Sequence, residues 1–119
     1  MAHGVERHDR RAAVDAVAAR EVAETMQALA APSRVRILAR LREGACSVTE
    51  LAEAVGMEGS AVSHQLRVLR HLGLVVGERN GRTVVYALHD SHVADLIDQA
   101  VWHVEHLRLG LVDRQERAS

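Results

Sequence analysis

Residues 47–73 read SVTELAEAVGMEGSAVSHQLRVLRHLG, and this stretch decides the fold. Ser47 is followed three residues later by Glu50, the pattern of a capping box, which predicts a short helix that ends at Gly56. A second helix is expected over about 59–72, where apolar residues recur at helical spacing up to Gly73. Two short helices joined by a brief turn that contains glycine are typical of a helix-turn-helix.

The chain changes period directly after this stretch. LVVGE (74–78) and RTVVYAL (82–88) are rich in β-branched residues, and between them lies Asn80-Gly81, a strong signal for a tight hairpin. A hairpin that follows a helix-turn-helix forms the wing of a winged helix-turn-helix. The sequence therefore predicts this fold.

Helical patterns flank this unit on both sides. We expect a first helix over 13–30, a second over about 32–42, and a last helix that Asp90 caps and that runs to about Arg108, before Gly110. The predicted order is α-α-α-α-β-β-α, a mainly α-helical fold with a small β-hairpin. The expected division of the chain is a flexible N-terminal arm (1–12), the winged helix-turn-helix domain (13–109) and a C-terminal tail (110–119).

Composition excludes several functional classes. The 119 residues suffice for one domain, and the single cysteine excludes an internal disulfide and fits a reducing compartment. No apolar run approaches the roughly 20 residues of a membrane span, and the N-terminus lacks the apolar core of a signal peptide. No Ser-His-Asp, P-loop or H-E-x-x-H signature occurs. We therefore expect a cytoplasmic protein that does not span a membrane and is not an enzyme.

The second helix of the helix-turn-helix has an apolar face, formed by Val62, Leu66, Leu69 and Leu72, and a polar one. Residues 60–86 carry four arginines against one glutamate, a net charge of +3 in a chain whose total is −1. Charges alone would also suit a solvated helix face, but the order of capped helix, turn, polar helix and hairpin favours DNA binding. The candidate DNA contacts are Ser60, Ser63, His64, Gln65, Arg67 and Arg70 on the helix, with Arg79 and Arg82 near the hairpin tip.

Over about residues 20–107 the sequence also resembles a known family. SAVSHQLRVLRHLGLV (60–75), followed by G-R-x-x-x-Y (81–86), is similar to the ArsR/SmtB family of bacterial metal-responsive repressors. The resemblance implies a homodimer built on the first and last helices, recognition of an inverted repeat in double-stranded operator DNA, and release of that DNA on metal binding. One version of the family uses two cysteines near the third helix. Here Cys46 stands alone, and we interpret it as a buried side chain.

The last helix carries the strongest candidate metal ligands, because His92, His103 and His106 share one face at 100° per residue. His92 and His103 are about 16 Å apart along the helix axis, whereas a metal–nitrogen bond is about 2 Å long, so one helix cannot close a site. In an antiparallel pair of helices, facing residues have a constant sum of residue numbers. That sum is 195 for His92 with His103 and 196 for Asp90 with His106. One register then gives two symmetric sites, each with Asp90 and His92 from one protomer and His103 and His106 from the other.

The donor atoms narrow the choice of metal. Oxygen and nitrogen ligands without a thiolate disfavour copper(I), lead and cadmium. Four such groups suit tetrahedral Zn(II), whereas Ni(II) and Co(II) favour further donors, which the α-amine of Ala2 and the imidazole of His3 can supply once Met1 is removed. MAHG (1–4) and DSHVADLIDQAVWHVEHLRLGL (90–111) most resemble the nickel- and cobalt-sensing branch of the family.

Three hypotheses remain open from the sequence. The first is a repressor that Ni(II) or Co(II) releases from its operator. The second is a Zn(II) sensor that uses the same four ligands and is indifferent to the N-terminal arm. The third is a winged-helix regulator of transcription with no metal response.

Overall fold

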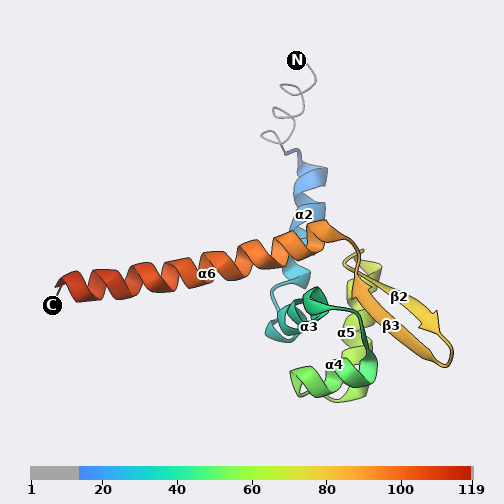
Figure 1. The fold of residues 1–119 in the computed structure, drawn as a ribbon. Coiled ribbons are helices and arrows are strands. Elements are labelled where there is room, and N and C mark those ends of the chain that lie inside the picture. The colour runs from blue at the N-terminus through green and yellow to red at the C-terminus, as the bar shows by residue number, and fades with distance from the viewer. Residues whose placement is uncertain (1–13, 119) are drawn as a thin grey trace.

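The computed structural model describes residues 14–118 (Figure 1). Its elements are, in chain order, α2 (Ala16–Ala28), α3 (Pro32–Glu43), β1 (Cys46–Ser47), α4 (Val48–Val55), α5 (Gly59–His71), β2 (Val75–Asn80), β3 (Thr83–Leu88) and α6 (Ser91–Ala118). The predicted helix-turn-helix is α4 and α5, and the predicted wing is β2 and β3. Within the described residues, none of the helices is both long enough and apolar enough to cross a membrane.

Local hydrogen bonds explain why α4 begins and ends where the sequence predicted. The Oγ of Ser47 accepts a bond of 3.2 Å from the backbone N–H of Glu50, and Oε1 of Glu50 accepts one of 2.9 Å from the N–H of Ser47. Two of the N–H groups at the helix start are thereby satisfied. Gly56 ends the helix with a φ of 66°, in the left-handed region that glycine enters without steric cost. The turn that follows leads directly into α5.

The sheet has one strand more than the sequence predicted. Its order is β1-β3-β2, and the two-residue strand β1 pairs antiparallel with β3, placing Cys46 opposite Tyr86. Two residues are too few to give a periodic signal, which is why this strand was missed. It matters because it joins the wing to the segment between α3 and α4.

One core unites α3, α4, α5, the sheet and the first turns of α6. Its fully buried large side chains include Ile37 and Leu38 of α3, Leu51 of α4 and Leu66 of α5. The start of α6 joins this core through Val93 and Ile97, which are also buried. Burial of each such side chain contributes about 1.5–3 kcal/mol, so the core fixes where α6 leaves the domain.

The outer helices depart from their predicted bounds. α2 begins at Ala16, not at residue 13, because Asp15 accepts a hydrogen bond of 2.8 Å from the N–H of Ala18 and caps the helix. The prediction that α6 ends at about Arg108, with a separate tail from residue 110, was wrong, since the helix runs for 28 residues through Gly110 to Ala118. Glycine inside a helix costs only about 1 kcal/mol relative to alanine and keeps its N–H, so it does not by itself end one.

α2 and the outer part of α6 leave the rest of the chain with their apolar side chains uncovered, as Figure 1 shows for the ribbon. On α2 only Ala28 is buried, and Met26 is 63% exposed. The apolar side chains of α6 fall into two groups: Val93 and Ile97 pack on the chain's own core, while several others stay exposed. These exposed residues are Leu96, Val101, Val104 and Leu107.

Candidate DNA interface and metal centre

α5 is the candidate recognition helix, and its predicted inward stripe is in the core. Val62, Leu66 and Leu69 are fully buried, and Leu72 is half-buried. Because buried positions recur every three or four residues, the rest of the helix surface faces outward. The predicted DNA contacts found there are Ser60, His64, Arg67 and Arg70, which are exposed, and Ser63, which is half-buried.

Gln65 lies on a flank of α5 and is held from within the chain. Its Oε1 accepts a hydrogen bond of 2.6 Å from Nε of Arg34 on α3. Arg34 also donates through Nη1 to the carbonyl of Ala28, at 3.4 Å. This hydrogen bond fixes the orientation of the Gln65 amide and leaves its N–H groups free of partners within the described residues.

The wing carries its two arginines at its tip. Pairing runs from Val75 opposite Leu88 to Asn80 opposite Thr83, so Gly81 and Arg82 form the two-residue turn. The hairpin was predicted correctly, but its central pair is one residue beyond Asn80-Gly81. Gly81, with a φ of 67°, takes the first central position of the turn. It is the only residue of β2, β3 and their turn that has a positive φ. Arg79 and Arg82 are exposed, in a position suited to contact phosphate.

Cys46 is fully buried in β1, as expected from the sequence. Burial raises the pKa of its thiol, so the thiolate that binds metals is disfavoured. Its Sγ lies 3.6 Å from the carbonyl oxygen of Gly44. The structure therefore gives Cys46 a packing role.

Asp90 occupies the start of α6, where it does two things. Its Oδ1 accepts hydrogen bonds from the backbone N–H groups of His92, at 2.9 Å, and Val93, at 3.2 Å, which confirms the predicted cap. Its Oδ2 lies 3.1 Å from Nδ1 of His89. The hydrogen bond with His89 is the main cause that lowers the pKa of Asp90, with the backbone bonds adding to it. The carboxyl group is thus ionised, as a metal ligand must be.

His92 stands beside Asp90 and faces solvent, with 89% of its side chain exposed. Its Nδ1 is 3.5 Å from Oδ1 of Asp90. Two atoms bound to one cation at about 2.0–2.1 Å lie roughly 2.9–3.4 Å apart, so this pair needs little movement to share a metal ion. The carboxylate and imidazole present at this end of α6 fit the proposed ligand set.

The other two candidate ligands lie farther along α6. His103 and His106 are exposed, and the ring of His106 stacks on Trp102 with centroids 4.8 Å apart and 18° between the planes. Within residues 14–111 of a single chain, whose side chains the structure describes, no three His, Cys, Asp or Glu side chains come together as a metal site. One chain therefore presents two separate half-sets of ligands, as the length of the helix requires.

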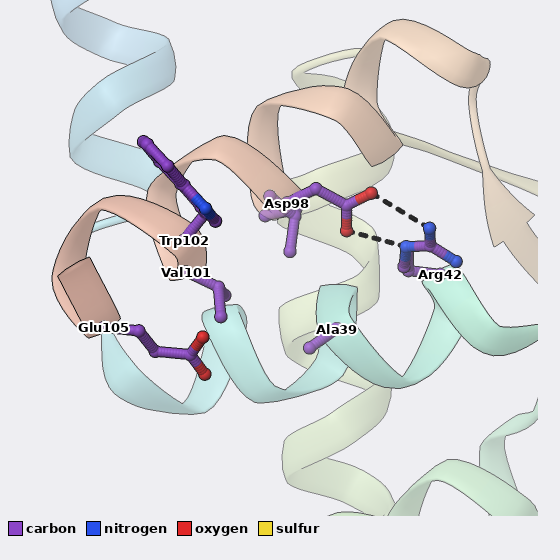
Figure 2. A pocket seen from close by; sticks show the side chains of 7 residues that line it. Ala39, Arg42, Asp98, Val101, Trp102 and Glu105 are labelled. Atoms are coloured by element: carbon purple, nitrogen blue, oxygen red, sulfur yellow. Dashed lines mark hydrogen bonds and ion pairs between the residues drawn. The ribbon is translucent and has the colours of Figure 1, made fainter.

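A groove of about 370 Å³ lies between α3 and α6 (Figure 2). At its edge, Nε and Nη2 of Arg42 donate hydrogen bonds of 2.7 and 2.9 Å to the two carboxylate oxygens of Asp98. This bidentate pair lowers the pKa of Asp98 and raises that of Arg42. This ion pair could not be predicted from sequence patterns, because the two residues are 56 positions apart.

Two predicted ligands, Ala2 and His3, lie outside the residues that the structure describes. Sequence reasoning also missed two residues that the structure places beside candidate functional side chains. Arg34 holds Gln65, and His89 holds Asp90. Only His89 left a sequence signal, since it directly precedes a predicted ligand.

The capped helix-turn-helix, the polar face of α5 and the arginine-tipped wing define the class, a winged helix-turn-helix DNA-binding protein. Known proteins agree with this assignment. Residues 31–76 match the family described as "Bacterial regulatory protein, arsR family". The chain is 62% identical over 119 residues, 99% of each protein, to the HTH-type transcriptional regulator NmtR of Mycobacterium tuberculosis (strain ATCC 25618 / H37Rv).

Solved structures give the same result. The solution structure of apo-NmtR superposes with a TM-score of 0.69 and 64% identity, covering 79% of each chain. A homodimeric winged helix-turn-helix DNA-binding domain from Mycobacterium bovis gives a TM-score of 0.71 at 31% identity, covering 76% of this chain and 83% of that one. The present chain belongs to the arsR family of bacterial regulatory proteins, and it is a transcriptional regulator, not an enzyme.

Proposed function

We propose that this protein is a cytoplasmic, metal-responsive repressor whose apo homodimer binds an inverted repeat in operator DNA and whose release is triggered by Ni(II) or Co(II). The observation that carries the proposal is the arrangement of ligands on α6. Asp90 and His92 form a half-set at one end, and His103 and His106 form a complementary half-set more than two helical turns away. Neither half-set can hold a cation securely alone.

The uncovered helices support a dimer. Monomeric proteins rarely leave large contiguous apolar surfaces in water. Yet α2 exposes Val17, Val22 and Met26, and α6 exposes leucines and valines along its outer part. A second copy that pairs α6 antiparallel with α6 covers such a face and brings the two half-sets together. The relative from M. bovis is described as homodimeric, which agrees with this proposal.

The ligand set suits a divalent cation. Asp90 and His92 from one protomer, with His103 and His106 from the other, would hold the ion, which supplies a cross-link between the two copies of α6. Ala2 and His3 are the proposed additional donors that favour six-coordinate Ni(II) or Co(II) over four-coordinate Zn(II). The identity of 62% with NmtR over nearly the whole chain supports the nickel- and cobalt-sensing branch.

Hydrogen bonds connect the start of α6 to the recognition helix. The backbone N–H of His89 donates to the carbonyl of Leu74 at 3.0 Å, and the N–H of Leu74 donates to the carbonyl of Leu69, on α5, at 2.9 Å. Only two residues, His89 and Asp90, separate β3 from α6. A shift in the first turn of α6 therefore moves both the wing and α5. A coupling free energy of about 1–3 kcal/mol between the two sites is typical of such proteins.

The deciding experiment is a titration of operator DNA by fluorescence anisotropy, with Ni(II), Co(II) or Zn(II) added to the wild type and to a variant that lacks Ala2 and His3. We expect nickel and cobalt to release the operator, and we expect the deletion to weaken that release. Release by zinc alone, with no effect of the deletion, would identify a four-coordinate zinc sensor. If no metal changes operator affinity, only the DNA-binding part of the proposal survives.

A further inference from the structure

His89 lies between the wing and the sensor helix, and the candidate ligand set does not include it. Its side chain is half-exposed, and its Nδ1 lies 3.1 Å from Oδ2 of Asp90. Its backbone is fixed independently, because its N–H donates to the carbonyl of Leu74 at 3.0 Å. The imidazole is thus presented to Asp90 from an anchored position.

The two oxygens of Asp90 have different partners. Oδ1 caps α6 by accepting from His92 and Val93, and it is also the oxygen nearest the imidazole of His92, at 3.5 Å. Hydrogen bonds to Oδ1 alone leave the position of Oδ2 free, because the carboxylate can pivot about Oδ1. The contact of Oδ2 with His89 removes that freedom and fixes the plane of the carboxylate.

We infer that His89 is a positioning residue for the metal site: it holds Oδ2 of Asp90 so that Asp90 and His92 form a pre-arranged pair of ligands before a cation arrives. This inference rests on the proposed function. A residue of this kind lowers the entropic cost of binding, and loss of an outer partner of a metal ligand typically weakens metal affinity by roughly 10–100-fold. The assignment rests on the contact between Nδ1 of His89 and Oδ2 of Asp90, and the spectrum of bound Co(II) distinguishes a positioning residue from a further ligand.

The test compares His89→Phe, which keeps a ring but removes the N–H, with His89→Asn, whose side-chain amide can donate from nearly the same place. His71→Phe, at the C-terminal end of α5 and outside the candidate ligand set, is the control for a histidine-to-phenylalanine change. Co(II) affinity is measured without DNA by competition with a chelator, and the Co(II) d–d absorption spectrum is recorded for each full-length dimer. Thermal unfolding of each apo protein checks that the variants fold.

We expect His89→Phe to weaken Co(II) binding by roughly 10–100-fold with an unchanged d–d spectrum. His89→Asn should restore most of the affinity, and His71→Phe should leave it at the wild-type value. Wild-type affinity in His89→Phe would overturn the inference and leave the proposed function intact. An altered d–d spectrum in His89→Phe, or an Asn variant as weak as the Phe variant, would also overturn the positioning role. A wild type that binds no Co(II) would remove both the proposed function and this inference.

Discussion

The DNA-reading half of this protein (α4, α5 and the wing) and its sensor half (α6) both carry apolar residues, but the two halves bury them to different extents. On α5 the apolar residues Val62, Leu66 and Leu69 are fully buried within one chain. Among residues 91–111 of α6, only Val93 and Ile97 are buried, and the outer residues, such as Leu107 at 55% exposure, face solvent. The DNA-reading half therefore has a complete core in a single chain, whereas the sensor half leaves an apolar surface that a single chain does not cover.

This difference separates folding from regulation. A DNA-reading half that is fully packed within one chain can keep the same structure whether or not the protein is bound to its operator. A sensor half whose contacts lie between chains can respond to a cation that changes those contacts. The two halves meet at residues 88–91, where β3 passes into α6.

The largest expected effect comes from truncating one leucine in each half, which tests whether the first stabilises the fold and the second the dimer. Leu66→Ala should lower the free energy of unfolding by about 2–5 kcal/mol, because it leaves a cavity in the shared core. Leu107→Ala should change mainly the dissociation of the dimer. Urea unfolding at several protein concentrations separates the two effects. An equally large, concentration-independent loss in Leu107→Ala would contradict the division into two halves.

Removing a candidate metal ligand tests whether the metal response can be lost while operator binding is kept. His103→Ala should abolish the metal-induced drop in operator affinity, which we expect to be roughly 5–150-fold, and leave apo operator binding unchanged. Gln99→Ala, one turn earlier on the same helix, is the matched control and should respond to metal like the wild type. Anisotropy titrations with and without Ni(II) measure both properties. Loss of apo operator binding in His103→Ala would make this histidine structural.

A substitution in the wing tests whether operator binding can be weakened while metal binding is kept. Arg82→Ala should weaken operator binding at every sequence and reduce the slope of log affinity against log salt by about 1, since one phosphate contact is lost. Metal affinity should not change. Arg20→Ala, an exposed arginine on α2, serves as the control. An unaltered salt slope in Arg82→Ala would show that the wing tip does not contact DNA.

The smallest expected effect concerns the ion pair that ties α6 to α3. Arg42 lowers the pKa of Asp98, so the pair stabilises the fold above the ordinary pKa of aspartate, about 3.9, and this stabilisation is lost as pH falls through the lowered value. Asp98→Asn should therefore reduce Tm slightly at pH 7, and the difference should vanish in acid. Thermal unfolding from pH 7 to pH 3 measures it, with Asp95→Asn as the control. A difference that does not shrink as the pH falls would exclude the ion pair as its cause.

The elements that depend on neighbouring residues could be predicted from the amino-acid sequence alone. The capping box of Ser47 and Glu50, the inward stripe of α5, the hairpin and the Asp90 cap all follow from local hydrogen bonding and periodicity, and the structure confirms each of them. The ligand types on α6 were also readable, and their roles stay a prediction. The predicted end of α6 was wrong, because glycine is a weak stop signal when good helix formers lie on both sides.

Contacts between side chains far apart in the sequence could be identified only from the folded structure. It joined Arg34 to Gln65 and Arg42 to Asp98, added β1 to the wing, and divided the apolar stripe of α6 between the chain's own core and solvent. These contacts join residues far apart in sequence, and their partners are chosen by the packing of the core. Periodicity shows which residues share a face of a helix, but what that face contacts is fixed only when the helices are packed together.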